Sequence, residues 1–254
     1  MLNYIRGPHA LLIAALLPAA CGANPSSPSD VLTATLESEN FSFRFSPGEN
    51  PQVDKQEAHH AWATAQLGIV LPQKIIYNKY RSREQMREAT GRGNTNGFAE
   101  PESFTVHTLF SWNNHEPIHV YTARIGRPSD FFDEGIAVAF QTDPAVGDFE
   151  SRFNGQQVHE AAAEYRAAGQ LLRLDQCVET SAFRAISDAT LAYREAGSYM
   201  KFLIDRHGLD PVKDFFRISG RNDSRSVIRE RFQAAFGQSL DTAETEWLAS
   251  LPVR

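Results

Sequence analysis

The spacing of apolar residues changes near residue 113, and this change constrains the fold more than any other feature of the chain. Before it, apolar and polar residues alternate as they do in strands, with short helical stretches between them; strands are predicted at 41–45, 74–80 and 104–110 and helices at 53–67 and 83–89. After it, helical spacing recurs through 114–125, 130–141, 155–172, 187–206, 211–219, 224–236 and 242–250. The chain is therefore predicted to be α+β, with a small mixed β-sheet and N-terminal helices over 31–112 and a mainly helical half over 113–254.

Composition agrees with a globular protein and excludes several other classes. The 254 residues are 42% apolar and 22% charged, unlike disordered chains, collagen-like repeats or coiled-coil rods. The 25 basic residues face 31 acidic ones, which gives a net charge of −6, and no basic run is present. Because nucleic-acid binding needs a clustered positive face, no nucleic-acid partner is expected.

Residues 1–20 have the pattern of a signal peptide. Arg6 makes the start positive, and the apolar run over 10–17 is too short to span a bilayer. Residues 16–21 (LLPAAC) resemble the lipobox of bacterial lipoproteins, so Cys21 is the predicted lipidation site. Ordinary secretion, with cleavage after Gly22, is the alternative. Both predict export, and lipid at Cys21 would anchor the protein to the bacterial cell envelope, in the outer membrane or periplasm.

The segment after the signal peptide is predicted to be a tether. Residues 21–30 are rich in Pro, Ser and Gly and lead into a single domain over 31–254. Cys177 is the only cysteine besides Cys21. If Cys21 carries lipid, no intramolecular disulfide can form, and Cys177 is then expected to be a small buried apolar residue.

Residues 115–119 (HEPIH) match the pattern H-E-x-x-H. On a helix, positions i and i+4 project from one face, so His115 and His119 can reach one ion. Glu116 follows the first ligand and can reach a water on that ion. Imidazoles and a free position for water suit zinc, so one Zn²⁺ per chain is expected. Roughly one or two chains in a hundred of this composition carry such a match by chance, and a third ligand is therefore needed.

Glu134 is the predicted third ligand. It stands near the start of a helical run among the aromatic residues of 131–140, where a carboxylate is costly to bury unless it is paired or binds metal. The alternative is an acid placed favourably at a helix N-terminus. Proximity to the motif favours the ligand. Gly135 costs about 1 kcal/mol relative to Ala inside a helix, and it would permit close approach of a neighbouring helix.

Pro117 is unusual within such a motif. In a helix interior proline removes a hydrogen bond and clashes, at a cost of about 3 kcal/mol. If Asn114 is the N-cap, Pro117 falls at the third helical position, where the amide has no intrahelical partner. The metal-binding helix is therefore predicted to start just before His115. The alternative is a chance match outside any helix.

The motif and the segment 131–137 (FFDEGIA) resemble the gluzincin zinc metallopeptidases, most closely the peptidase MA-like family, whose members follow H-E-x-x-H with an aromatic-x-x-E-G-x-A segment. The similarity covers about residues 36–251 and is strongest at 113–140. It implies a gluzincin-like fold with the zinc site between the two halves. The ligands and the general base that it implies are His115, His119 and Glu134, with Glu116 as the base that takes a proton from the attacking water.

The resemblance also implies a side chain that stabilises the oxyanion of peptide hydrolysis. Tyr193 matches best and Tyr199 second, and a tyrosine that only packs on a long helix is the alternative. The Gly-x-Met-Glu-Asn signature of the aminopeptidase branch is missing, since 97–100 (GFAE) matches it only in part. No preference for amino termini is therefore predicted.

The other histidines receive no role at the metal. His59 and His60 lie on a polar helical stretch typical of a solvated face. His107 lies on the strand before the motif, which is a candidate for an edge strand that pairs with an extended peptide.

Three functions fit these observations. The leading hypothesis is a zinc-dependent peptidase acting on a peptide or protein substrate. A catalytically inactive, peptidase-like envelope lipoprotein, serving as a binding or structural module, is the alternative if Pro117 displaces Glu116. A small-molecule hydrolase with the same zinc centre is the third. The complete set of two histidines and two glutamates favours the first.

Overall fold

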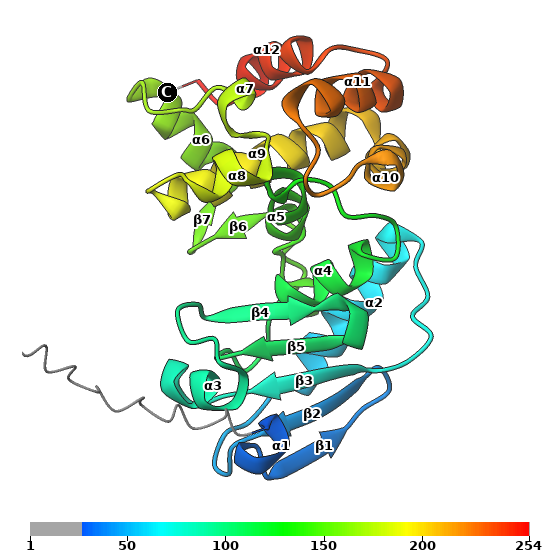
Figure 1. The fold of residues 1–254 in the computed structure, drawn as a ribbon, viewed down its shortest axis with the longest axis vertical. Coiled ribbons are helices and arrows are strands. Elements are labelled where there is room, and N and C mark those ends of the chain that lie inside the picture. The colour runs from blue at the N-terminus through cyan, green and yellow to red at the C-terminus, as the bar shows by residue number, and fades with distance from the viewer. Residues whose placement is uncertain (1–26, 254) are drawn as a thin grey trace, which may run out of the picture.

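The computed structural model describes residues 27–253. Its two halves, a sheet with its helices and a bundle of helices, meet at α4 (Glu116–Thr122) and α5 (Asp130–Ala139) (Figure 1). The predicted α+β class is confirmed. The signal peptide predicted at 1–20 and the lipidation site predicted at Cys21 lie outside the described residues.

The sheet has five strands in the order β1-β2-β3-β5-β4. They are β1 (Ala34–Glu37), β2 (Phe41–Phe45), β3 (Ile75–Lys79), β4 (Gly97–Glu100) and β5 (Thr105–Thr108). The three predicted strands are confirmed as the parallel centre of the sheet, and β1 and β4 run antiparallel along its edges. The strand that carries His107, β5, lies between β3 and β4, so its prediction as an edge is wrong. The edge beside the helical half is β4, a four-residue strand that was not predicted.

Alternation in β2 directs its aromatic side chains to one face of the sheet. Phe41 and Phe43 are fully buried there in the main core, which α2 (Val53–Leu67) and α4 also enter. Helices α1 (Pro28–Val31) and α3 (Arg83–Thr90) contribute to a separate small cluster made of Leu32, Tyr80, Met86 and Ala89. Since α1 begins at Pro28, residues 28–30 of the predicted tether (21–30) belong to this helix instead.

The solvated face predicted for His59 and His60 is wrong, because both imidazoles lie on the buried part of α2. His59 is fully buried, and its Nε2 lies 2.9 Å from the backbone carbonyl oxygen of Phe140. His60 is 8% exposed, and its Nδ1 lies 2.9 Å from the Tyr121 hydroxyl. Burial lowers the pKa of His59 to about 4, so this imidazole is neutral in the folded protein.

The helical half is built around α9 (Ala189–His207), against which α5 packs. Its other helices are α6 (Val158–Ala167), α7 (Leu174–Cys177), α8 (Thr180–Arg184), α10 (Leu209–Ile218), α11 (Arg225–Phe236) and α12 (Leu240–Ser250). The short helices α7 and α8 were not predicted. The run predicted over 155–172 is shorter than expected: α6 ends at Ala167, and the start of the run forms β7 (Gln156–Gln157), which pairs with β6 (Arg152–Phe153). Cys177 is a free buried cysteine, as predicted.

Gly135 allows α5 and α9 to approach closely, as predicted. A Cβ at this position would lie 2.6 Å from Met200 Cγ and 2.7 Å from the carbonyl oxygen of Ala196, closer than real Cβ atoms approach. A glycine is therefore required at this contact. Helix α5, which carries the neighbouring residue Glu134, lies at the junction of the two halves (Figure 1).

Candidate metal centre

Asn113 organises the start of α4. Its Oδ1 accepts hydrogen bonds from the backbone amides of His115 (2.8 Å) and Glu116 (2.9 Å), whereas Asn114 donates to a backbone carbonyl elsewhere. The helix begins at Glu116, with His115 as the N-cap residue, so the prediction of Asn114 as N-cap is wrong. Pro117 lies in the first turn, where backbone amides have no intrahelical acceptor, and the helix therefore tolerates it.

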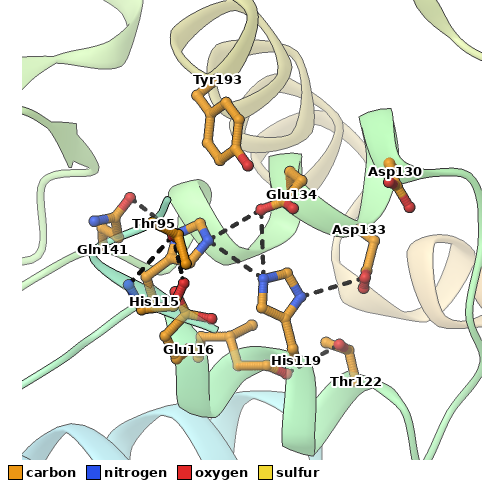
Figure 2. A network of polar contacts seen from close by, with 12 residues as sticks. Thr95, His115, Glu116, His119, Thr122, Asp130, Asp133, Glu134, Gln141 and Tyr193 are labelled. Carbon is orange, nitrogen blue, oxygen red and sulfur yellow. Dashed lines mark hydrogen bonds and ion pairs between the residues drawn. The ribbon is translucent and has the colours of Figure 1, made fainter. Parts of the chain in front are cut away.

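The side chains of the three predicted ligands converge on one point (Figure 2). Glu134 Oε2 lies 3.1 Å from His115 Nε2 and 3.4 Å from His119 Nε2, and the two nitrogens are 3.3 Å apart. Two ligand atoms that each lie about 2.0–2.1 Å from a tetrahedral zinc are about 3.3 Å from one another. Two imidazoles and one carboxylate at these spacings therefore fit a single tetrahedral ion, with one position left for water.

The opposite end of each ligand side chain also has a polar partner. The outer contacts join His119 Nδ1 to Asp133 Oδ2 (3.3 Å), His115 Nδ1 to Gln141 Oε1 (3.3 Å) and Glu134 Oε1 to Arg184 Nη2 (2.6 Å). Outer partners of this kind fix the orientation of metal ligands and are a regular part of metal sites. Here they leave both Nε2 atoms and Oε2 free to face the common point.

Electrostatics at the centre oppose the effect of burial. Although burial disfavours its charged form, the carboxylates of Asp133 and Glu134 raise the pKa of His119 well above its usual value. Burial would raise the pKa of Glu134, but the charge of His119 and hydrogen bonds from both histidines hold it well below the usual range. The site therefore keeps an ionised carboxylate in a buried place.

Glu116 lies beside the ligands at the first position of α4 and lines the same cleft. Burial raises the pKa of its carboxyl, and the neighbouring His115 and His119 oppose that rise. A Cβ on Gly97 would lie 2.9 Å from Glu116 Oε1, so a larger residue there would push against this carboxylate. The edge strand β4 consequently passes directly beside Glu116.

The two tyrosines proposed for the oxyanion lie in different surroundings. Tyr193, on α9, lines the cleft and points toward the ligands, with its ring centroid 6.1 Å from that of His115 (Figure 2). Tyr199 is fully buried in the core, where its ring packs against Phe131 and Trp247. Tyr199 does not line the cleft, so of the two only Tyr193 is placed to meet a substrate.

Arg184 and Asp133 are the residues of this centre that sequence reasoning missed. Arg184, at the end of α8, donates to Glu134 and to Asp130 (2.5 Å), and its Nη1 donates to the Tyr193 hydroxyl (3.2 Å). It thus connects the third ligand to the tyrosine. The five-residue helix α8 gives no periodic signal, but the adjacent acids Asp133 and Glu134 were a usable sign that both carboxylates belong to one site.

The centre opens into a cleft of about 870 Å³ between the sheet edge and the helical half. No family model matches the chain, and no curated protein matches it. The gluzincin resemblance therefore rests on the residues of the motif and the segment that follows it. Within residues 27–253, no helix has the length and apolar character needed to cross a membrane.

Proposed function

We propose that this protein is a zinc-dependent peptidase. The observation that carries the proposal is the convergence of His115 Nε2, His119 Nε2 and Glu134 Oε2, at 3.1–3.4 Å from one another, beside the carboxylate of Glu116. Nothing in the packing of α4 requires a glutamate at position 116, where its side chain is directed into a cleft instead of toward solvent. Pro117 in the first turn leaves Glu116 at the cleft, which supports the catalytic hypothesis over the inactive alternative.

The residues divide the work of hydrolysis between them. His115, His119 and Glu134 would hold the ion, which supplies Lewis acidity toward the substrate carbonyl and toward water when it is bound. Glu116 takes a proton from the attacking water and passes it to the leaving amine, and its raised pKa suits a group that must both accept and return a proton. The Tyr193 hydroxyl faces the developing oxyanion and donates a hydrogen bond to it.

The edge strand β4 supports a peptide as the substrate. One side of β4 is paired with β5, and no strand of the described chain pairs with its other side. An extended peptide can add to such an edge by main-chain hydrogen bonds, which would bring its backbone past Gly97 and beside Glu116. The prediction of peptide binding along an edge is thus moved from β5 to β4. Export and anchoring by lipid at Cys21 remain part of this proposal.

The proposal is tested by replacing Glu116 with Gln and measuring metal content and hydrolysis of a peptide library. Loss of a general base costs about 10²–10⁴-fold in rate, so hydrolysis should fall by that factor while about one zinc per chain is retained. Glu88→Gln, an exposed acid on α3, is the matched control and should behave as the wild type. Full activity in Glu116→Gln would remove the mechanism. A folded wild type that binds no zinc would remove the metal centre.

A further inference from the structure

The cleft is rich in arginine although the chain as a whole is acidic. The net charge of the protein is −6, yet the charged side chains that line the cleft include five arginines and only three carboxylates. The arginines are Arg83, Arg92, Arg127, Arg184 and Arg221. Charge of one sign gathered in a concave site attracts ligands of the opposite sign more strongly than the net charge suggests.

Three of these arginines already have carboxylate partners. The pairs are Arg127 with Glu102 (3.4 Å), Arg184 with Asp130 (2.5 Å) and Glu134 (2.6 Å), and Arg221 with Asp130 (2.8 Å). Their charges are largely compensated by these ion pairs. The pairs stabilise the fold, and one of them holds Glu134, the predicted third ligand. These three therefore explain little of the cleft's capacity to bind an anion.

Arg83 and Arg92 differ from the other three. Within the described chain neither forms an ion pair with a carboxylate. Arg83 donates from Nε and Nη2 to Asn96 Oδ1 (3.0 and 2.7 Å), and the Arg92 guanidinium lies over the Phe98 ring, 4.7 Å from its centroid. A neutral amide and an aromatic face hold a guanidinium in place without cancelling its charge. Both arginines thus have an ordered position and an uncompensated charge.

Their positions relate them to the proposed substrate strand. Asn96 and Phe98 flank Gly97 at the start of β4, and a Cβ on Gly97 would lie 2.9 Å from Glu116 Oε1. An extended peptide paired with β4 would advance about 3.3 Å per residue. A residue that lies one to three positions from the bond beside Glu116 would therefore reach the two guanidinium groups.

We propose that Arg83 and Arg92 form an anion subsite that selects peptides carrying a carboxylate within about three residues of the scissile bond. The inference rests on the proposed peptidase function, because that function supplies the peptide and its path along β4. The carboxylate belongs either to an Asp or Glu side chain or to the C-terminus of the peptide. Guanidinium groups bind both in the same way.

Binding can be measured without hydrolysis in the Glu116→Gln protein. The probes are three pools of octapeptides with a neutral fluorophore and otherwise uncharged residues. The first pool has a central Glu and an amidated C-terminus. The second has a central Gln and an amidated C-terminus, and the third has a central Gln and a free C-terminus. We expect the Glu pool or the free-carboxylate pool to bind about fivefold more tightly than the neutral pool in fluorescence anisotropy, and this preference should weaken with added salt.

The variant that tests the subsite carries Arg83→Gln and Arg92→Gln together. Both side chains are exposed, and the preference for the carboxylate pools should fall to about onefold. Arg87→Gln is the matched control, because Arg87 lies one turn further along α3, pairs with Glu84 and is outside the cleft. It should keep the preference. A double variant that still prefers the carboxylate pools would overturn the subsite, as would equal binding of all three pools to the parent protein.

The result separates this inference from the proposed function. Hydrolysis of a peptide library by the wild type without any charge preference would remove the subsite and leave the peptidase. A charge preference that depends on Arg83 and Arg92, in a protein that hydrolyses no peptide, would leave the subsite and remove the peptidase. The pool that shows the preference identifies which carboxylate the two arginines bind.

Discussion

Two buried glutamates on neighbouring helices, Glu134 on α5 and Glu195 on α9, have opposite electrostatic surroundings. Glu134 is 8% exposed and Glu195 is 1% exposed, so both have lost most contact with water. The pKa of Glu134 is nevertheless held well below its usual range, whereas burial raises the pKa of Glu195 to about 8. Burial alone therefore does not decide whether a carboxyl in this protein is charged.

Their partners account for the difference. Glu134 Oε2 faces two imidazoles, and its Oε1 accepts a hydrogen bond from Arg184. Glu195 accepts one bond from the backbone amide of Leu172 (3.1 Å), and its other oxygen has no hydrogen-bond partner among the described residues. A carboxylate that donors surround stays ionised in a buried place and can still serve as a metal ligand. One without such donors is neutral and belongs to the core.

The largest expected effect comes from replacing Glu134 with Gln, which keeps the shape but removes the charge. Zinc affinity should fall by about 1000-fold or more (~4 kcal/mol), because a change in an outer partner already costs 10–100-fold. Competition with a chromophoric chelator measures this fall. Glu195→Gln is the matched control, a buried glutamate on the neighbouring helix, and it should leave zinc affinity unchanged. Equal affinity in both variants would show that Glu134 is not a ligand.

The converse experiment concerns Glu195 and measures how the free energy of unfolding depends on pH. The folded-state pKa of Glu195 lies above its usual value of 4.5, so its contribution to stability is complete below about pH 4.5 and is lost as the pH rises toward 8. Glu195→Gln cannot lose a proton. The difference in free energy of unfolding between variant and wild type should therefore shift in favour of the variant by about 3 kcal/mol between pH 5 and pH 8.

Denaturant unfolding at several pH values measures that shift. The buried amide of Gln costs some stability at every pH, so the slope against pH is the informative quantity. Glu230→Gln, an exposed acid on α11, should leave the slope of the wild type unchanged. Parallel curves for Glu195→Gln and the wild type would mean that Glu195 is ionised in the folded protein, and the contrast with Glu134 would disappear.

The geometry of the candidate metal centre could be predicted from the sequence. The i and i+4 spacing of His115 and His119 and the nearby Glu134 are local features, and the three atoms do meet in the structure. Gly135 was predicted to permit a close helix contact, and it does. Local spacing is informative when the residues concerned lie on one helix or on the next one along the chain.

The parts that could not be predicted depend on long-range packing. Arg184 reaches Glu134 across 50 positions from a helix too short to show a period. The place of β4 at the edge follows from strand order, which alternation within a strand does not encode. His59 appeared solvent-facing because the stretch around it is polar, yet its ring is enclosed by the aromatic side chains of Trp62 and Trp112.

The smallest expected effect tests the arginine partner that Glu134 has and Glu195 lacks. Arg184→Gln removes the charged donor from Glu134 Oε1 and should weaken zinc binding by about tenfold (~1.4 kcal/mol), within the usual range for an outer partner. The Arg184 side chain is 46% exposed and Asp130 keeps its pair with Arg221, so the melting temperature of the metal-free protein should change little.

Arg173→Gln, an exposed arginine just before α7, serves as the control for loss of a positive charge. Unchanged zinc affinity in Arg184→Gln would mean that the two imidazoles alone hold Glu134 in its ionised, ligand-ready position. A lower melting temperature with unchanged affinity would instead assign Arg184 to the packing of α8.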